Sequence, residues 1–415
     1  MSEVVAKATL ARQAAGALAN LSTSDKNEAL LLMAEALVHQ AEVIMIANHE
    51  DIERGRREGT SESMLDRLRL DYTRIEAIAS ALRQIADLDD PVGTLLETME
   101  RPNGLIIEKI RVPLGVIGII YEARPNVTVD AAGLSLKTGN AVVLRGGSAA
   151  LSSNRKIIEV LHEALERSAM PKEALQLIED ADRASVNELM RLNGLIDVII
   201  PRGGSSLIQN VVQNSTVPVI ETGAGICHTF IDASADADMA RDIALNAKVQ
   251  RPSVCNSMET LLVHTDYDQQ AFLQLAEALR QHQVEVRGCP LTRELLPWAE
   301  IATEQDYATE YNDYILNIKL VSSLDEALQH IATYSTKHSE CIVTRDEAHA
   351  ARFMQEVDAA AVYHNASTRF TDGFEFGFGA EIGISTQKLH ARGPMGLPAL
   401  TSTKYRIYGN GQIRQ

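Results

Sequence analysis

The stretch Ala141-Val142-Val143-Leu144-Arg145-Gly146-Gly147-Ser148 decides the fold class. Its first four residues form a short apolar run typical of a buried strand, and the glycines that follow are typical of a tight turn into a helix. Further apolar runs alternate with amphipathic helices such as Asn154–Ser168 and Arg183–Leu192. Strands that alternate with helices predict a parallel sheet covered on both faces. These other runs are Val116–Ile120, Ile196–Ile200 and Pro218–Ile220.

A second α/β series follows the first. The chain has 415 residues, and a single core stops growing well below that length, so several domains are expected. Two successive series predict two parallel-sheet α/β domains that face a cleft. The first ninety residues read as helices, one of them starting at Ser22–Asp25. The strands of the second series are expected at Thr260–Val263, Val284–Arg287, Ile315–Val321, Glu340–Val343 and Ala360–Tyr363.

Two polar, strand-like segments stand outside this alternation. Residues 100–112 read as a hairpin-like insertion, and the tail 394–415 contains a second strand-like stretch. Together they predict a small β flap that pairs subunits in a homo-oligomer. The alternative is a surface ribbon that pairs with nothing.

Composition excludes several classes of partner. The formal net charge of −17 argues against nucleic acid and against an anionic membrane surface. An anionic substrate would need local cations, because the overall field repels it. Four isolated cysteines, no basic leader and no long apolar run indicate a reducing, cytoplasmic setting. The histidines lack metal-binding spacing, so we expect no catalytic metal.

Cys255 is the candidate nucleophile. It lies in Gln250-Arg251-Pro252-Ser253-Val254-Cys255-Asn256, between a helix expected at about 236–248 and a strand that begins near Thr260. A loop at the edge of a sheet often presents reactive groups, and Arg251 would favour the thiolate. From the local sequence alone, the alternative is a buried structural cysteine, which is the commoner case for cysteines in general.

Two glycine turns are candidate phosphate sites. Arg145-Gly146-Gly147-Ser148 and Arg202-Gly203-Gly204-Ser205 each follow a strand and precede a helix. Glycine permits close approach of the backbone to a phosphate, and a helix N-terminus offers free N–H groups. Neither turn matches the usual dinucleotide fingerprint, and each could be an ordinary tight turn.

Three further segments carry candidate polar groups. Glu221 could be a general base or a turn-stabilising acid. Asn126 could donate to an oxyanion, and Arg124 could hold an anionic substrate, although Arg-Pro-Asn is also an ordinary turn. Arg392 lies in a glycine-rich, cation-bearing segment that lines a cleft or simply connects to the tail.

Together these residues resemble the aldehyde dehydrogenase superfamily and, within it, the gamma-glutamyl phosphate reductases of proline biosynthesis. The resemblance rests on Thr138–Arg145, on Glu221-Thr222-Gly223-Ala224 and on Cys255 downstream of them. Three further matches indicate the reductase branch: Tyr121–Thr128, His330–Glu340 and Ser385–Gly396.

The resemblance implies an NADPH-dependent reduction of L-glutamyl 5-phosphate to the semialdehyde through a Cys255 thioester. It implies Asn126 as oxyanion donor, with the role of Glu221 open, because a reductase must keep water from its thioester. Gly146, Gly147, Ser148, Gly203, Gly204 and Ser205 would bind NADPH, and Arg145 would read its 2′-phosphate. Arg124 and Arg392 would hold substrate anions, and a glutamate kinase is the expected supplier.

The resemblance also implies a domain map. Residues 1–99 and 113–224 would bind NADP, residues 225–393 would be catalytic, and the flap would pair subunits. Two rival functions stay open. One is an oxidising aldehyde dehydrogenase that uses Glu221 and water, and the other is a cysteine acyl hydrolase or acyltransferase without redox chemistry.

Overall fold

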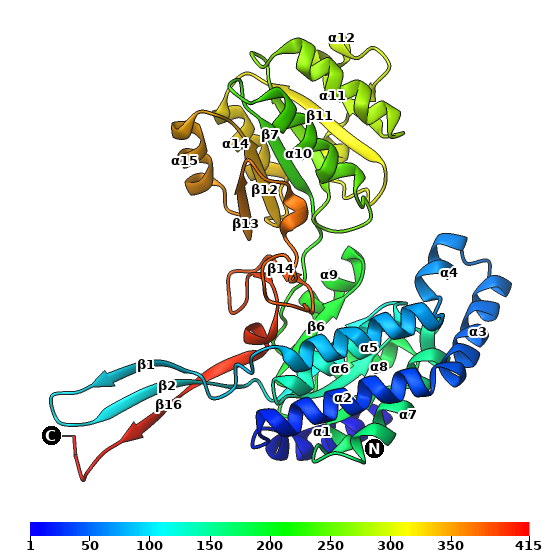
Figure 1. Ribbon diagram of the computed structural model, residues 1–415, viewed down its shortest axis with the longest axis vertical. Helices are drawn as coiled ribbons and strands as arrows, with labels where there is room; N and C mark the ends of the chain where they lie inside the picture. The colour runs from blue at the N-terminus through cyan, green and yellow to red at the C-terminus, as the bar shows by residue number, and fades with distance from the viewer. Residues whose placement is uncertain (415) are drawn as a thin grey trace. The chain divides into compact units, whose positions relative to one another are not determined.

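The computed structural model describes residues 1–414, apart from the side chain of Ser63. The chain divides into two compact units. Unit 1 comprises residues 1–221, 377–383 and 395–415, and unit 2 comprises residues 222–376 and 384–394. Each unit contains its own parallel sheet (Figure 1). The predicted α/β class with two parallel-sheet domains is therefore confirmed.

The sheet of unit 1 has four parallel strands in the order β5-β4-β3-β6. All six residues of β3 are buried, because helices cover the sheet and an apolar run is buried on both faces. Unit 1 also contains 3-10 turns at Ser148–Ala150, Lys172–Ala174 and Leu397–Leu400. The strands are β3 (Val116–Tyr121), β4 (Ala141–Arg145), β5 (Leu175–Leu177) and β6 (Val198–Arg202), and the helices between them are α6 (Pro125–Lys137), α7 (Leu151–Leu165), α8 (Arg183–Leu189) and α9 (Ser205–Asn214).

Helices fill the first part of unit 1, as expected. Ser22 caps α2 and forms a capping box with Asp25, so the predicted helix start is confirmed. Leu30, Met33 and Leu37 are buried on one side of that helix, at the spacing that places side chains on a common face. The helices are α1 (Glu3–Leu18), α2 (Thr23–His39), α3 (Ala41–Arg57), α4 (Glu62–Leu68) and α5 (Tyr72–Asp87).

The sheet of unit 2 has seven parallel strands in the order β10-β9-β11-β8-β7-β12-β13. One core packs α10 and α11 against the sheet, and a second core packs α14 and α15 against its other face. The strands are β7 (Cys227–Ile231), β8 (Met258–His264), β9 (Glu285–Gly288), β10 (Glu300–Ile301), β11 (Ile315–Val321), β12 (Ser339–Val343) and β13 (Ala361–His364). The helices are α10 (Ala237–Val249), α11 (Gln269–Gln281), α12 (Pro290–Leu295), α13 (Glu304–Tyr307), α14 (Leu324–Tyr334) and α15 (Glu347–Glu356), with a 3-10 turn at Thr368–Phe370 and a short pair β14 (Ile384–Ser385) and β15 (Gly393–Pro394).

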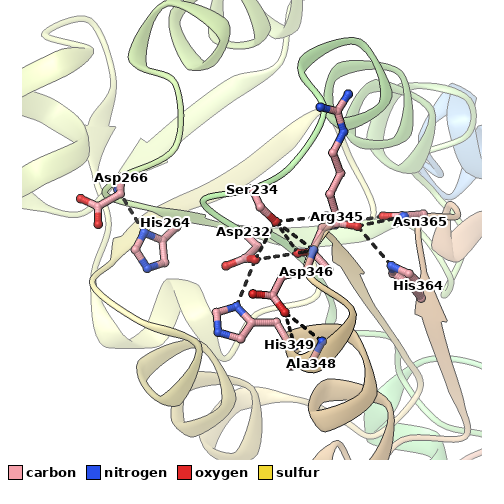
Figure 2. A network of polar contacts seen from close by, with 11 residues as sticks. Asp232, Ser234, His264, Asp266, Arg345, Asp346, Ala348, His349, His364 and Asn365 are labelled. Carbon is pink, nitrogen blue, oxygen red and sulfur yellow. Dashed lines mark hydrogen bonds and ion pairs between the residues drawn. The ribbon is translucent and has the colours of Figure 1, made fainter.

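A polar network closes the carboxyl edge of this sheet (Figure 2). Asp232 accepts hydrogen bonds from Thr344 at 2.6 Å and from Ser234 at 3.3 Å, and its Oδ2 lies 3.1 Å from Nδ1 of His349. Asn365 binds the backbone of Thr344 through both atoms of its amide. The ends of β7, β12 and β13 are thereby joined.

A three-stranded antiparallel ribbon extends from unit 1 (Figure 1). It consists of β1 (Leu95–Glu100), β2 (Ile106–Pro113) and β16 (Thr401–Tyr408), with β2 in the centre. It begins at Leu95 rather than at Glu100, so the expected insertion is longer than the sequence indicated. The two strand-like segments that are distant in the sequence are neighbours in one sheet.

Two expectations in the sheets were wrong. Pro218–Ile220 forms only an isolated bridge between Ile199 and Val219 instead of a strand. Strand β7, next to the middle of the larger sheet, was missed because two of its five residues are the polar His228 and Thr229.

Among residues 1–414, no single helix is both long and apolar enough to cross a membrane. The consecutive helices α2 and α3, bent by 69°, satisfy that test only as a pair.

Candidate active site

Cys255 lies on the loop between α10 and β8, at the amino edge of the parallel sheet of unit 2. It is partly exposed. Gly225 packs directly beneath it, since a Cβ on Gly225 would lie 1.5 Å from the Cys255 carbonyl oxygen. The Gly225 N–H donates to Glu310 at 2.7 Å. Only glycine permits this approach, so the Cys255 backbone has a fixed support.

Hydrogen bonds hold the Cys255 loop on two further sides. The buried Cys227 thiol donates to the Cys255 carbonyl at 3.2 Å. The Asn256 amide donates to the carbonyls of Arg369 at 3.2 Å and Thr371 at 2.9 Å, and Thr368 donates to the Asn256 carbonyl at 2.8 Å. The segment 368–371 is therefore fastened to the residue that follows Cys255. A nucleophile fixed in this way needs little reorganisation before it reacts.

Two arginines belong to the Cys255 surroundings. Arg251 is exposed on the same loop, and Arg369 donates from Nε to the Gln250 side chain at 2.8 Å. Burial and the neighbouring Arg251 lower the pKa of Arg369, whereas the Cys255 and Asp372 charges raise it. Nearby cations favour the thiolate form of a cysteine. Arg251 lies on the Cys255 loop as the sequence indicated, and Arg369 is a second nearby arginine that the sequence did not indicate.

The other cysteines have structural surroundings. Burial raises the pKa of Cys341 to about 12, and its thiol donates to a backbone carbonyl. Burial also raises the pKa of Cys227. Cys289 contacts Thr292 at 3.3 Å. None of the three combines partial exposure with the flanking arginines of Cys255.

Arg392 is engaged by an acid of its own unit. Its guanidinium lies 2.8 Å from Asp358, which also pairs with Lys388 at 2.9 Å and Lys337 at 3.4 Å. These cations hold the pKa of Asp358 well below its usual range. Arg392 is thus one of three cations that pair with Asp358, and its contact with a substrate anion stays a prediction.

In unit 1 the second glycine turn carries an anion-binding helix end. Gly204 is the N-cap of α9, and its N–H donates to the Glu122 carboxylate at 3.0 Å. A Cβ on Gly203 would lie 2.6 Å from the carboxyl carbon of Glu122, so glycine leaves room for that carboxylate in its present position. The turn therefore already binds an anionic oxygen through a backbone N–H, and the positive end of the helix dipole favours such binding.

The first glycine turn serves a different purpose. The carboxylate of the buried Asp51 accepts hydrogen bonds from the N–H groups of Ser152 at 3.2 Å and Ser153 at 2.8 Å. It thereby occupies the N-terminus of α7. A Cβ on Gly146 would lie 2.5 Å from Asn154, so this glycine permits packing. An internal carboxylate thus occupies the helix end next to Gly146, Gly147 and Ser148, and phosphate binding at these three residues stays a prediction.

Arg145 also turns inward. Its guanidinium donates to the carbonyls of Gly146 at 2.9 Å, Ala181 at 2.7 Å and Asp182 at 3.1 Å, and the side chain is 8% exposed. Burial lowers its pKa. Arg145 thus fastens the segment after β5 to the turn. The expected 2′-phosphate contact stays a prediction.

Asn126 and Arg124 lie at the start of α6. Asn126 is exposed and donates to Asp130 at 3.2 Å. Burial raises the pKa of Asp130 to about 6, against the opposing effects of Asn126 and Arg202. Arg124 is the exposed N-cap residue of α6, and its N–H donates to the Glu122 carbonyl at 2.8 Å. Asn126 and Arg124 belong to unit 1 and Cys255 to unit 2.

Glu221 is the last residue of the first segment of unit 1, and it is half-buried. The preceding Ile220 binds the Ile199 carbonyl through its N–H at 2.9 Å. Glu221 therefore ends a segment that bridges to β6 and does not share a unit with Cys255.

The sequence did not single out Arg369, Glu122 or Asp51. Arg369 lies 114 positions after Cys255 (369 − 255) in a segment that offers only an ordinary turn signal. Glu122 was visible within the quoted Tyr121–Thr128 motif, and its position directly after a strand could have marked it. Asp51 lies inside a helix, where no sequence signal separates it from a solvated acid.

Comparison with known proteins identifies the family. Residues 1–293 match the model of the aldehyde dehydrogenase family. The chain is 60% identical over 413 residues to the gamma-glutamyl phosphate reductase of Moorella thermoacetica, covering 100% of this chain and 99% of the relative. It is 58% identical to that of Caldanaerobacter subterraneus, covering 100% of both. The crystal structure of the Thermotoga maritima gamma-glutamyl phosphate reductase superposes with a TM-score of 0.98 at 48% identity, covering 100% of both chains. This chain therefore belongs to the aldehyde dehydrogenase family, among the gamma-glutamyl phosphate reductases.

Proposed function

We propose that the protein catalyses the NADPH-dependent reduction of L-glutamyl 5-phosphate to L-glutamate 5-semialdehyde with release of phosphate, a step of proline biosynthesis. The full-length similarity to relatives that carry this name is the observation that supports it most. The fixed, partly exposed Cys255 between two arginines supplies the chemistry that the reaction requires.

Cys255 carries the acyl group as a thioester in this scheme. Its thiolate attacks the acyl carbon, and the oxyanion that develops is held by the Cys255 N–H and the Asn126 amide. The C–O bond to the phosphate breaks, its electron pair leaves with the phosphate, and a thioester remains. A reduced nicotinamide, when bound, would supply the hydride that this carbon needs. Collapse of the resulting thiohemiacetal frees the aldehyde and restores the thiolate.

The residues of unit 1 fit a nicotinamide dinucleotide. The α9 N-terminus donates a hydrogen bond from the Gly204 N–H to a carboxylate oxygen of Glu122. That oxygen stands in for a phosphate oxygen at the turn of Gly203, Gly204 and Ser205. Binding of the pyrophosphate there would require Glu122 to move aside. The Gly146 turn would support this site without contacting phosphate, because Asp51 occupies the adjacent helix end.

Preference for NADPH over NADH rests on the resemblance to this reductase branch, since Arg145 is bound to backbone carbonyls. We expect a kcat/KM at least tenfold higher with NADPH than with NADH. Equal values in a side-by-side assay would contradict the preference. We expect Arg145→Ala to alter folding stability more than this ratio.

Glu221 has no step in the scheme. A base that activated water would hydrolyse the thioester and yield glutamate. If the protein were an oxidising dehydrogenase, Glu221 would be that base.

The reaction also suggests how the protein operates in the cell. Acyl phosphates are labile, so a glutamate kinase in the same cytoplasm would supply the substrate. We assign dinucleotide binding to unit 1, acyl transfer to unit 2, and subunit pairing to the ribbon of β1, β2 and β16.

The deciding experiment runs the reaction backwards with glutamate 5-semialdehyde, NADP⁺ and phosphate, and follows NADPH absorbance. NADPH formation that requires phosphate is expected. Cys255→Ser should reduce the rate at least a thousandfold, and the matched control Cys289→Ser should keep it within about twofold.

The rival functions give different results in the same assay. NADPH formation without phosphate would indicate an oxidising dehydrogenase, and Glu221→Gln should then abolish it. Thioester or acyl-phosphate cleavage without any change in NADPH would indicate a cysteine acyl hydrolase or acyltransferase.

A further inference from the structure

Arg369 stands at the point where the Cys255 loop meets a segment far along the chain. Its carbonyl accepts from the Asn256 amide, and its Nε donates to Gln250, five positions before Cys255 (255 − 250). The neighbouring Thr368 donates to the Asn256 carbonyl at 2.8 Å. Side chains before and after Cys255 are thus tied to Arg369, and the Asn256 carbonyl is tied to its neighbour Thr368. These contacts hold Arg369 close enough to Cys255 for their charges to interact.

The charges around Cys255 make Arg369 a candidate ligand for an anion. The chain has a net charge of −17, so a doubly charged phosphoryl group needs a local cation to approach. Arg369 is partly buried, and burial and then Arg251 lower its pKa, while the Cys255 charge acts in the opposite direction. Asp372 also contributes a favourable charge to Arg369. Guanidinium groups bind phosphate oxygens in a bidentate manner, and partial burial strengthens that contact.

The chemistry of the substrate decides which anion this arginine meets. The phosphate oxygen is bonded directly to the acyl carbon that Cys255 attacks. The α-carboxylate stands at the far end of the glutamyl chain. A cation fixed beside the Cys255 thiolate is therefore positioned for the leaving group.

We propose that Arg369 binds the phosphoryl group of the acyl phosphate beside Cys255 and stabilises it as it leaves. This inference rests on the proposed function and extends it to a specific residue. As the thiolate bonds to the acyl carbon, the C–O bond breaks and its electron pair departs on the phosphate oxygen. Arg369 offsets that charge without exchanging a proton. In the reverse direction the same residue binds the inorganic phosphate that attacks the thioester.

Turnover in the reverse direction tests the assignment with three variants. Arg369→Ala should raise the KM for phosphate at least tenfold and leave the KM for the semialdehyde within about twofold. Arg369→Lys should lie between this variant and the parent, because a lysine keeps the charge and loses the bidentate contact. The matched control Arg345→Ala, an exposed arginine at the opposite edge of the same sheet (Figure 2), should change neither constant.

A second experiment needs no turnover. Alkylation of Cys255 by iodoacetamide is followed by mass spectrometry of its peptide, with and without inorganic phosphate at constant ionic strength. Phosphate should slow alkylation in the parent and in Arg345→Ala, but not in Arg369→Ala. The pH midpoint of alkylation without phosphate should also rise in Arg369→Ala, since the thiolate loses a cation.

The two experiments separate failure of this proposal from failure of the proposed function. Phosphate protection that persists in Arg369→Ala, or an increase in the semialdehyde KM alone, would overturn the phosphate assignment. Protection that depends on Arg369 in a protein without phosphate-dependent turnover would keep the phosphate site and reject the proposed reaction. If Arg369→Ala does not fold, Arg369→Lys and Arg369→Gln carry the same comparison.

Discussion

At the scale of single residues, the loop of the candidate nucleophile Cys255 is held by residues that are distant in the sequence, among them Arg369. Cys255 could be predicted because its neighbours in the sequence form a recognisable motif. Arg369 and Glu122 could not be assigned, because their roles depend on partners far along the chain. The inward contacts of Arg145 could not be predicted for the same reason. A strand-end arginine can reach outward to an anion or inward to carbonyls, and only the fold decides between them.

Gly225 offers a sharp test of the support beneath Cys255. The Gly225→Ala change adds a Cβ 1.5 Å from the Cys255 carbonyl oxygen, so the nucleophile loop must shift. We expect at least a hundredfold loss of kcat and a loss of about 2 kcal/mol in the free energy of unfolding. The control is Gly16→Ala in α1, where no atom lies within 4 Å of the added Cβ and stability should rise slightly. Normal kcat in Gly225→Ala would contradict the fixed-loop account.

His338 gives unit 2 a pH-dependent stability. The imidazole is fully buried, and burial lowers its pKa from 6.5 to about 4. On acidification the unfolded chain therefore binds a proton before the folded one. The stabilisation is complete above pH 6.5 and is lost between pH 6.5 and about 4. Between about pH 7.5 and pH 5 the loss attributable to this group is about 2 kcal/mol.

The measurement compares the urea unfolding free energy of the parent and of His338→Gln across that range. The parent should be the more stable at neutral pH, and its advantage should shrink by about 2 kcal/mol at pH 5. Parallel pH curves for the two proteins would contradict the assignment. His39→Gln, an exposed histidine in the last turn of α2, is the control and should follow the parent.

At the scale of elements, regular patterns were predictable and exceptions were not. The apolar runs of β3, β4 and β11 gave strands within two residues of their expected bounds. Strand β7 escaped because it buries His228 and Thr229. Both the His228 N–H and its ring nitrogen lie within 2.9 Å of Glu340, a residue 112 positions away. A buried polar residue whose hydrogen-bond partner lies so far along the chain gives no local sequence signal for a strand.

The buried pair of Lys248 and Glu259 joins α10 to β8, the two elements that flank the Cys255 loop. Their side chains are 0% and 1% exposed and lie 2.8 Å apart. Burial lowers the pKa of Lys248 and raises that of Glu259 to about 7, against the effect of each partner. Lys248→Met should lower the free energy of unfolding by about 3–5 kcal/mol, because it leaves a buried acid unpaired.

The double variant Lys248→Met with Glu259→Gln should recover most of that loss, since no buried charge remains and the glutamine oxygen can still accept from Asn312. Chemical denaturation measures both effects. The solvent-exposed ion pair of Lys172 and Glu166 is the control, and its disruption should leave the free energy of unfolding nearly unchanged. Equal costs for the two pairs would show that burial does not decide their contribution.

At the scale of the whole molecule, the two-sheet organisation followed from the order of the elements along the chain. The sequence placed the end of the first domain at residue 224, and the structure divides the chain after Glu221. It could not show that residues 377–383 return to unit 1, because a short glycine-rich segment carries no periodicity. It also could not show that the two strand-like segments join one ribbon, since pairing between distant strands is set by the fold.

The ribbon exposes apolar side chains that a second copy of the chain would cover. Leu95, Tyr405, Ile407 and Tyr408 are 53%, 55%, 61% and 49% exposed, and β1 and β16 are edge strands. Such strands pair readily unless something protects them. We expect the purified protein to have a mass above the 45.3 kDa of one chain. Ile407→Asp should weaken assembly by about 3 kcal/mol, or about a hundredfold in the dissociation constant, because it places a charge in an apolar interface.

The ribbon has a close control in unit 2, where Ile301 on the edge strand β10 is 63% exposed. Light scattering behind a sizing column should show Ile407→Asp shifting towards 45.3 kDa while Ile301→Asp keeps the parent mass. At protein concentrations low enough for the chains to be dissociated, both variants should have nearly the same denaturation midpoint as the parent. Neither side chain belongs to a core. A parent protein of single-chain mass would leave the ribbon as a surface element, the alternative that the sequence left open. An equal shift in both variants would assign the effect to added charge rather than to the ribbon.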